Sequence, residues 1–311
     1  KMYKIKRHES LSENIFLIDV SAPRVAEKCL PGQFVIVRAD EKGERIPLTI
    51  CDYNRENGTV MLVVQIVGAS TLKLSRLSEN DGVEDIVGPL GVPSEIVTAD
   101  DEFLKNKNII FVAGGGGTAP VYPQVKYLSE RGYKFDVIIG AKSKNIVILE
   151  DEMKRYAKNV YVCTDDGSYG FKGLVTDKLS ELTESGEKYD ICVAIGPVIM
   201  MKFVSKLTEK LGIEQIVSMN PVMVDGTGMC GACRVTVGGK TFFTCVDGPE
   251  FDGHAVDFDE AMRRQGMYRT QEERDAVKVI EENIDDMHKV VAYLLEKETI
   301  TGEQFMQILN G

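Results

Sequence analysis

Three cysteines lie close together at the spacing of a metal or iron–sulfur site. Cys230 and Cys233 are separated by two residues, and Cys245 follows after eleven more. Three glycines precede or separate the first pair, at positions 226, 228 and 231. A loop around an inorganic cluster needs glycines, because its backbone N–H groups point at sulfides and side chains must stay clear. A C-x2-C pair followed by a single cysteine therefore indicates an iron–sulfur or a zinc site.

The residue five positions before Cys230 is the best candidate for a fourth ligand. It is Asp225, and it stands where the plant-type 2Fe–2S spacing C-x4-C-x2-C…C has its first cysteine. Tetrahedral zinc would need another cysteine or histidine nearby, and the nearest histidine, His254, lies nine residues beyond Cys245. We therefore predict a 2Fe–2S cluster held by Asp225, Cys230, Cys233 and Cys245. A zinc knuckle or three unligated thiols remain the alternatives.

The composition is that of a soluble globular protein. A chain of 311 residues, 43% apolar and 27% charged, suggests two or three domains. The net charge of −11 argues against a nucleic-acid partner, because duplex binding depends on clustered cations. No apolar run approaches the length that spans a membrane. The other cysteines, at positions 29, 51, 163 and 192, are scattered in apolar contexts, so we expect buried thiols, no disulfide framework and a cytoplasmic setting.

Residues 1–99 show the pattern of short strands. Four β-branched runs are broken by turn residues, at 15–20, 33–38, 59–67 and 85–91. Few helical patterns interrupt them, which predicts a small closed antiparallel barrel. The string Arg45-Ile-Pro-Leu-Thr-Ile50 lies within it. Gly68-Ala-Ser-Thr71 ends a strand and opens a helical stretch, and small residues at a helix N-terminus suit a pyrophosphate.

Residues 100–220 alternate between strand and helix patterns. Apolar strand runs at 108–113, 135–140, 160–164 and 191–195 alternate with helical stretches at 119–130, 174–182 and 198–211. This predicts a doubly wound α/β unit that binds its ligand at the carboxyl ends of its strands.

Three of these strands end in residues that suit a nucleotide. Gly114-Gly-Gly-Gly-Thr118 lies between a buried strand and a helix, where glycines let a pyrophosphate approach the backbone. Asp165 and Asp166 follow another strand and either bind ribose hydroxyls or make an Asx turn. Gly196 closes a third strand with the same ambiguity.

The tail, residues 261–311, carries a heptad-like apolar stripe. Its members are Val277, Ile280, Ile284, Met287, Val291 and Leu294. A second short helix is expected at about 303–309. The stripe either packs on the protein's own domain or docks a partner subunit.

These motifs in order resemble the ferredoxin–NADP reductase superfamily over about residues 1–268. The motifs are R-x-P-L-T, G-A-S-T, G-G-G-G-T-A-P, T-D-D-G-S-Y-G and the cysteine loop. The sequence looks most like the iron–sulfur branch, which includes the dihydroorotate dehydrogenase electron-transfer subunit and the small subunit of NADH-dependent ferredoxin:NADP oxidoreductase, related to sulfide dehydrogenase. In the first of these, four cysteines hold the cluster, so Asp225 favours the second.

The resemblance implies a domain division and a set of cofactor contacts. An FAD-binding β-barrel would cover 1–99, an NAD(P)-binding α/β domain 100–220, a 2Fe–2S subdomain 221–260 and a helical tail 261–311. The FAD contacts would be Arg45, Pro47, Leu48, Thr49, Val63, Val64, Gln65, Ile66, Gly68, Ser70 and Thr71. The pyridine nucleotide contacts would be Gly115, Gly116, Gly117 and Thr118, joined by the candidates Asp165, Asp166 and Gly196.

The resemblance also implies an activity. NADH would transfer a hydride to FAD, and the 2Fe–2S cluster would pass single electrons to or from a larger partner that carries a second flavin and 4Fe–4S clusters, with ferredoxin reached indirectly. Hydride transfer needs no general base, and we assign no catalytic residue. NAD(H) is the expected nucleotide, although Lys142, Ser143 and Lys144 would also suit the 2′-phosphate of NADP(H). A dihydroorotate dehydrogenase or sulfide dehydrogenase subunit, and a scaffold without cofactors, are the alternatives.

Overall fold

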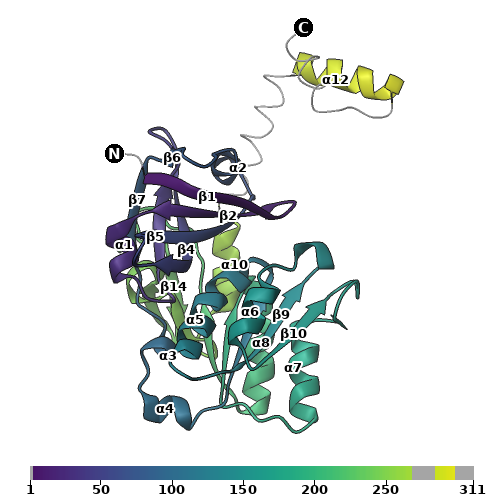
Figure 1. Cartoon of the computed structure of the whole chain (residues 1–311). Helices are drawn as coiled ribbons and strands as arrows, with labels where there is room; N and C mark the ends of the chain where they lie inside the picture. Colours follow the sequence, from purple (N-terminus) through teal and green to yellow (C-terminus); the bar gives the residue numbers. More distant parts are fainter. Residues whose placement is uncertain (1–2, 268–283, 298–311) are drawn as a thin grey trace. The chain divides into compact units, whose positions relative to one another are not determined.

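The computed structural model describes residues 3–267 and 284–297. The chain divides into two compact units, Lys1–Met262 and Arg263–Gly311. The first unit contains two large sheets, and the second contributes the helix α12 (Ile284–Lys297) (Figure 1). The predicted stripe positions 277 and 280 and the predicted helix at 303–309 lie outside the described residues.

The first sheet is antiparallel and seven-stranded. Its strands follow in the order β6-β1-β2-β5-β4-β3-β7. Their bounds are β1 (Tyr3–Ser12), β2 (Ile15–Ser21), β3 (Phe34–Arg38), β4 (Arg45–Asn54), β5 (Thr59–Gln65), β6 (Gly82–Val83) and β7 (Asp85–Leu90). Two helices lie between strands, α1 (Pro23–Lys28) and α2 (Ala69–Ser75). The two end strands of this order, β6 and β7, are separated in the chain only by Glu84, so the sheet curls round on itself, in agreement with the predicted barrel.

The second sheet is mostly parallel, as predicted. Its order is β11-β10-β9-β8-β12-β13-β16, and only β16 runs antiparallel to its neighbour. The bounds are β8 (Ile109–Gly114), β9 (Asp136–Ala141), β10 (Asn159–Thr164), β11 (Phe171–Lys172), β12 (Ile191–Ile195), β13 (Glu214–Ser218) and β16 (Glu250–Asp252). The strand order reverses between β8 and β12, which is where open α/β sheets bind ligands.

Helices cover both faces of the second sheet (Figure 1). The main ones are α5 (Thr118–Glu130), α6 (Glu150–Tyr156), α7 (Val175–Glu184) and α8 (Val198–Leu211). Alternate residues of β8 divide between the faces. Phe111 packs in one core with α5 and α6, whereas Ile110 and Val112 pack in the other with α7 and α8. This alternation explains why β8 is a continuous apolar run, since both of its faces are buried.

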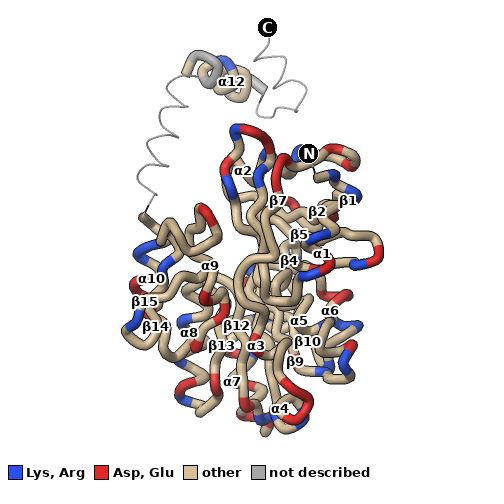
Figure 2. The backbone as a smooth tube through the Cα atoms, turned by 90° about the vertical axis from the view of Figure 1, so that its left-hand side faces the viewer, with Lys and Arg blue, Asp and Glu red and all other residues tan. Residues whose placement is uncertain are grey.

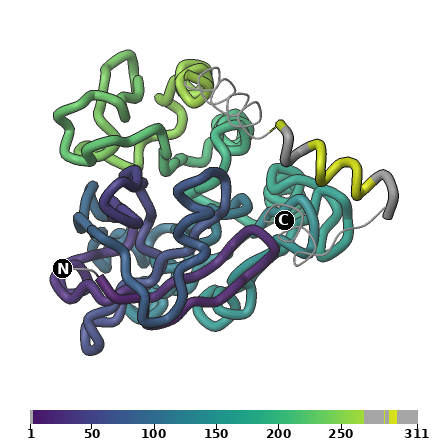
Figure 3. The backbone as a smooth tube through the Cα atoms, turned by 90° about the horizontal axis from the view of Figure 1, so that it is seen from above, coloured from purple at the N-terminus to yellow at the C-terminus, as the bar shows by residue number. Residues whose placement is uncertain are grey.

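A small segment links β13 to β16 and lies against the first sheet. It contains β14 (Arg234–Val237), β15 (Lys240–Phe243) and α9 (Thr244–Asp247). Seen from above, this segment (green) runs beside the strands of the first sheet (purple and blue) (Figure 3). No strand was predicted in this segment, because runs of four residues give little periodicity.

The remaining elements are short. They are α3 (Glu95–Thr98), α4 (Asp101–Lys105), α10 (Phe258–Gln265) and the 3-10 turns η1 (Gly115–Gly117) and η2 (Lys144–Ile146). Charged residues of both signs lie along the outer helices and loops, whereas the central strands are mostly uncharged (Figure 2). In the described ranges, no helix is both long and apolar enough to cross a lipid bilayer.

Candidate functional site

The cysteine loop (residues 223–233) brings one of its predicted ligands, Cys233, together with Cys245. The sulfur atoms of Cys233 and Cys245 are 3.2 Å apart, and both residues are buried. Cys230 is exposed at the rim of the same loop. Burial, followed by the neighbouring Cys233, raises the pKa of Cys245 to about 12. A metal ion would reverse this shift, because a coordinated thiol is deprotonated.

Asp225 folds back on the loop. Its Oδ1 accepts a hydrogen bond from the Thr227 N–H and its Oδ2 one from the Cys230 N–H, both at 2.9 Å. The Thr227 bond is the main cause of the lowered pKa of Asp225, so the group stays an anionic oxygen donor. Each oxygen has a second lone pair, and these bonds leave it able to bind iron.

The donor set fits an iron–sulfur cluster better than zinc. Over residues 3–267 and 284–297, no three His, Cys, Asp or Glu side chains converge as ligands of a single ion. His254 is engaged elsewhere, with its Nε2 3.0 Å from the Thr208 hydroxyl. Two adjacent buried thiols, an exposed thiol and a carboxylate in a glycine-rich loop are the chemistry that a larger cluster requires.

The cysteine loop is fixed by its glycines and by the first sheet. Gly226 and Gly228 have φ values of +75° and +84°, in the left-handed region that favours glycine. A Cβ on Gly226 would lie 2.9 Å from a Leu90 methyl carbon and 3.0 Å from Ile36. Cys233 and Cys245 share a core cluster with Phe34 and Ile36 of β3. The cysteine site is therefore attached to β3, the partner strand of β4.

The predicted FAD residues lie where two strands of the first sheet diverge. β4 pairs with β5 only from Ile50 onward, whereas its earlier part, Arg45 to Thr49, pairs with β3. The later part of β5 pairs instead with β2. The strings 45–49 and 63–65 thus flank an opening in the sheet. All residues of 45–49 are partly buried, as is Val63, whereas Val64 is buried and Gln65 is exposed. A partly buried surface suits a planar ligand.

The residues predicted to hold the FAD pyrophosphate lie around the start of α2. Gly68 is its N-cap. The Thr71 hydroxyl accepts hydrogen bonds from the N–H groups of Val67 and Gly68. Ser70 donates its hydroxyl hydrogen bond to Glu44 at 2.6 Å. Thr71 therefore shapes the turn, whereas Ser70 presents a hydroxyl at the surface.

The glycine run (residues 114–117) contains two kinds of glycine, two that are closely packed and two that border open space. A Cβ on Gly114 would lie 2.3 Å from the Met200 sulfur, and one on Gly117 would lie 2.1 Å from the Ile195 carbonyl oxygen. These glycines let the ends of β8 and β12 approach each other, as does Gly196. Gly115 has open space around its Cβ position, and Gly116 would place a Cβ 3.7 Å from Gln65 Oε1. The open side of the run therefore faces the end of β5.

Asp165 and Asp166 lie at the carboxyl end of β10, beside that of β9. Asp166 makes the Asx turn that the sequence left open, because its Oδ1 accepts the Ser168 N–H at 2.9 Å. Contacts with Ser168 lower the pKa of Asp166. The Lys144 ammonium lies over the Tyr169 ring. Asp165 is exposed at this edge and available to a ribose.

A buried polar network that was not predicted connects separate parts of the fold. The Ser94 hydroxyl donates to Gln124 Oε1 at 3.0 Å, and Gln124 Nε2 donates to Glu250 Oε1 at 2.7 Å. The other carboxylate oxygen of Glu250 is buried without a hydrogen-bond partner in the described part of the chain. Ser94 and Gln124 are 30 positions apart, and Gln124 and Glu250 are 126 positions apart. No local sequence pattern therefore marks the network.

Two family models match the chain. The iron–sulfur cluster binding domain of dihydroorotate dehydrogenase B matches residues 220–257. The oxidoreductase NAD-binding domain matches residues 111–206. These ranges contain the cysteine loop and the glycine run, respectively.

Curated relatives extend the match over most of the chain. An uncharacterised protein in the adh 3′ region of Clostridium beijerinckii is 59% identical over 91% of this chain and 96% of its own length. A homologue of the electron transfer subunit of dihydroorotate dehydrogenase B (NAD(+)) from Thermotoga maritima is 46% identical over 86% of this chain and 92% of its own length.

A solved structure agrees with these relatives. A chain of the NADH-dependent reduced ferredoxin–NADP oxidoreductase, studied for flavin-based electron bifurcation, superimposes with a TM-score of 0.82 and 44% identity, covering 90% of this chain and 98% of that one. The chain is thus an NAD(H)-dependent redox subunit that uses FAD and an iron–sulfur cluster. It belongs to the ferredoxin reductase-like family of the dihydroorotate dehydrogenase B electron transfer subunits.

Proposed function

We propose that the chain is the small subunit of an NADH-dependent ferredoxin:NADP oxidoreductase, in which it exchanges hydride with NAD(H) and relays single electrons to or from a larger flavin and iron–sulfur subunit. Residues 1–99 would bind FAD, 100–220 the nucleotide and 221–260 the cluster, with 261–311 as a helical tail. Ferredoxin would be reached only through the partner.

One observation carries this proposal, namely that three candidate cofactor sites meet around β3, β4 and β5. The open side of the glycine run faces Gln65 at the end of β5. The opening between β4 and β5 lies beside it. The cysteine loop packs on Ile36 of β3, which is paired with Pro47 of β4. A nucleotide, a flavin and a cluster in these seats would be neighbours in that order.

We assign each predicted residue to one of the three cofactor sites, where it would bind and orient the cofactor. Arg45, Pro47, Leu48, Thr49, Val63, Val64, Gln65 and Ile66 would line the flavin, and Gly68, Ser70 and Thr71 its pyrophosphate. Gly115, Gly116, Gly117, Thr118, Asp165 and Gly196 would hold the nucleotide, with Asp166 shaping the turn. Asp225, Cys230, Cys233 and Cys245 would hold the cluster.

When bound, FAD exchanges hydride with NAD(H) while a 2Fe–2S cluster exchanges single electrons. The chain supplies distance, orientation and exclusion of water. No side chain is needed to take up a proton from the nicotinamide, and we assign none. An oxygen ligand at Asp225 is a harder donor than a thiolate, so the cluster potential would differ from that of an all-cysteine site.

The surface around Cys230 suits a partner subunit. Exposed apolar side chains lie along and beside the cysteine loop, namely Val222, Val224, Met229 and Val246. Met229 is 89% exposed next to Cys230, and apolar patches of this kind mark interfaces. We place the complex in the cytoplasm, because none of the seven cysteines is in a disulfide, as expected in a reducing compartment.

Anaerobic spectroscopy tests the proposal. We expect two irons and one FAD per purified chain, bleaching of the flavin by NADH, and a cluster signal in electron paramagnetic resonance. Asp225→Cys should shift that signal, whereas Asp225→Asn, which keeps an acceptor for the Cys230 N–H, should lower iron content. Zinc in place of iron, or no flavin after reconstitution, would refute the proposal. An unshifted signal in Asp225→Cys would remove only Asp225 from the ligand set.

The names of the relatives favour a second candidate, the electron transfer subunit of a dihydroorotate dehydrogenase. Asp225 argues against this candidate, because four cysteines are expected to hold the cluster in that subunit. Adding dihydroorotate to the purified complex decides between the two, because flavin reduction by dihydroorotate requires the second function and NADPH-linked reduction of ferredoxin requires the first.

A further inference from the structure

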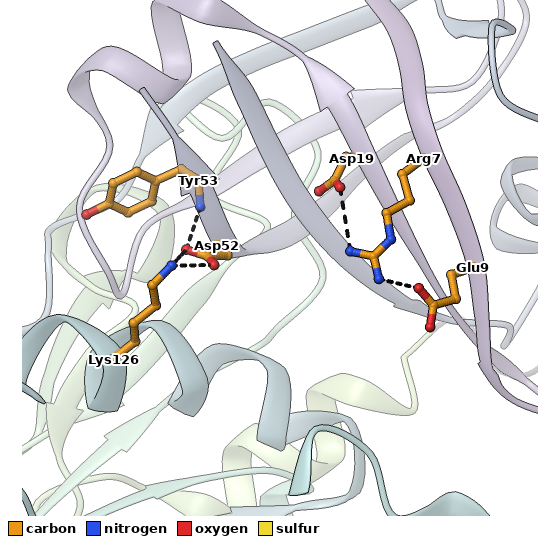
Figure 4. Close-up of polar contacts among 6 residues, drawn as sticks. All are labelled: Arg7, Glu9, Asp19, Asp52, Tyr53 and Lys126. Carbon is orange, nitrogen blue, oxygen red and sulfur yellow. Dashed lines mark hydrogen bonds and ion pairs between the residues drawn. The ribbon is translucent and has the colours of Figure 1, made fainter. Parts of the chain in front are cut away.

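An ion pair joins β4, which carries the predicted flavin contacts 45–49, to α5, which begins directly after the glycine run. The Lys126 ammonium of α5 lies 2.6 and 2.9 Å from the two carboxylate oxygens of Asp52 on β4 (Figure 4). Each side chain is 22% exposed. The pair is therefore sheltered from solvent, and both oxygens of the carboxylate are used.

The backbone around Asp52 fixes the direction of its side chain. The register of β4 against β5 shifts between Ile50 and Asp52, which is the mark of a bulge. The residue between them, Cys51, is fully buried in the core shared with α5. Asp52 also accepts the Tyr53 N–H at 2.8 Å. Bulges re-aim side chains, and this one turns the carboxylate toward α5.

Lys126 stays charged in this environment. Burial lowers the pKa of Lys126, but the hydrogen bond and charge of Asp52 outweigh it, and the net shift is upward. A second charge group lies on β1 and β2, which do not adjoin β4. There Arg7 contacts Asp19 at 3.9 Å and also pairs with Glu9 (Figure 4). Arg7 is thus paired with Asp19, whereas the ion-pair partner of Asp52 is Lys126.

Beside the ion pair, Arg55 and Glu56 of the first-sheet region and Glu130 of α5 line a polar cavity, and other contacts between α5 and the sheet are apolar. Val121 and Tyr122 of α5 pack in one core with Cys51, and Met61 and Val63 of β5 lie against it. Apolar burial is non-directional and permits small rotations and slips. A two-oxygen ion pair has a defined geometry. The pair is therefore the contact best suited to set the angle at which α5 crosses β4.

The crossing angle matters because the predicted nucleotide contacts lie at the start of α5 and the predicted flavin contacts lie in the first half of β4. Thr118 is eight residues before Lys126, about 12 Å along the helix. Thr49 is three residues before Asp52, about 10 Å along the strand. A small rotation at the ion pair is carried along both elements to the nucleotide and flavin seats.

We propose that Lys126 and Asp52 are positioning residues for hydride transfer, which hold α5 on β4 so that the nicotinamide meets the flavin at reacting distance. This inference rests on the proposed function, because it needs both seats to be filled as assigned there. Neither residue belongs to the flavin or nucleotide sites assigned above; both would act through the elements that carry those sites. Misplacement by about 1 Å costs on the order of 100-fold in rate.

Single-turnover kinetics of the anaerobic protein test this. Lys126→Met and Asp52→Asn should slow flavin reduction by NADH about 10- to 100-fold, raise the deuterium isotope effect measured with NADH labelled at the transferred position, and leave NADH affinity within about twofold. Lys126→Arg should keep most of the rate, because it retains the charge. The exchanged variant Asp52→Lys with Lys126→Asp should recover part of it.

Lys178→Met is the matched control, since Lys178 forms its ion pair with Glu181 within α7. It should leave rate and isotope effect unchanged. FAD content and thermal unfolding are measured for every variant. A fall in melting temperature with an unchanged isotope effect and rate would overturn the positioning role while leaving the proposed function intact. A wild-type protein that holds FAD but is not reduced by NADH would overturn both.

Discussion

The glycine run and the cysteine loop are both rich in glycine, but for different physical reasons. In the cysteine loop, Gly226 and Gly228 have positive φ values, so the backbone itself favours glycine, and contacts with Leu90 and Ile36 add to this at Gly226. In the glycine run, Gly117 has a helical φ of −63° and is required because the carbonyl of Ile195 occupies the space of a side chain. The first loop is shaped mainly by its own backbone, and Gly117 of the second by a strand 78 residues away in the sequence. Gly115 of the same run has a positive φ of +54° and meets no neighbour, as a local requirement would have it.

This difference teaches how each loop should respond to substitution. Adding a methyl group to a glycine of positive φ costs about 1–2 kcal/mol whatever surrounds it. Adding one against a backbone carbonyl forces two strands apart, and its cost depends on how far they can move. The comparison therefore predicts different effects for the same chemical change.

The largest effect is expected for Gly117→Ala. Its Cβ would lie 2.1 Å from the Ile195 carbonyl oxygen and 2.9 Å from Gly196, and neither backbone atom can rotate away. We expect a loss of about 3 kcal/mol in the free energy of unfolding, together with weaker NADH binding. Urea unfolding and NADH titration measure the two. A loss below about 0.5 kcal/mol would show that the strand ends are not in close contact.

An intermediate effect is expected for Gly226→Ala in the cysteine loop. Strain at φ +75° and contact with Leu90 and Ile36 should together cost about 2 kcal/mol and lower the iron content of the purified protein. Gly238→Ala is the control, because Gly238 has a φ of +56° but no neighbour within 4 Å. It should cost about 1 kcal/mol and leave iron content unchanged. Equal iron content in the two variants would contradict the account.

A pH-dependent effect is expected at Glu250, which connects the two regions through Gln124 of α5. Burial raises the pKa of Glu250 above its ordinary value of 4.5, so the folded state binds this proton more tightly than the unfolded state. Stability from this group is present below pH 4.5 and is lost as pH rises toward the folded pKa, by at most about 1.4 kcal/mol per pH unit.

Glu250→Gln removes that dependence. Unfolding by urea at several pH values above 4.5 should show the variant gaining stability relative to the wild type as pH rises. Parallel curves would mean that Glu250 does not take up a proton on folding. The partner variant Gln124→Met should lower stability at every pH, because it removes a donor from a buried carboxylate.

The smallest effect on stability is expected for Gly116→Ala. A Cβ there would meet only Gln65 Oε1, at the ordinary contact distance of 3.7 Å. Stability should change by less than about 0.5 kcal/mol, whereas the dissociation constant of NADH should rise because the methyl group enters the proposed seat. Unchanged NADH affinity would move the nucleotide away from the open side of the run.

Much of the local structure was predictable. The uninterrupted apolar run of β8 and the stop of α8 at Gly212, which has a left-handed φ of +69°, follow from periodicity and from the conformational freedom of glycine. The strand predicted to reach Val67 ends at Gln65, because Val67 is 79% exposed and its N–H bonds to Thr71. Side-chain capping of this kind competes with a strand ladder.

The sequence by itself determined the order of the elements, the spacing of the three cysteines and the turns that need glycine, since each depends on residues a few positions apart. Only the tertiary structure decided that Cys233 and Cys245 lie 3.2 Å apart, that Gly117 abuts Ile195, and that Lys126 and Gln124 of one helix reach Asp52 and Glu250. Such contacts join residues 12 to 126 positions apart. They depend on the path of the chain and on core packing, which no local pattern encodes.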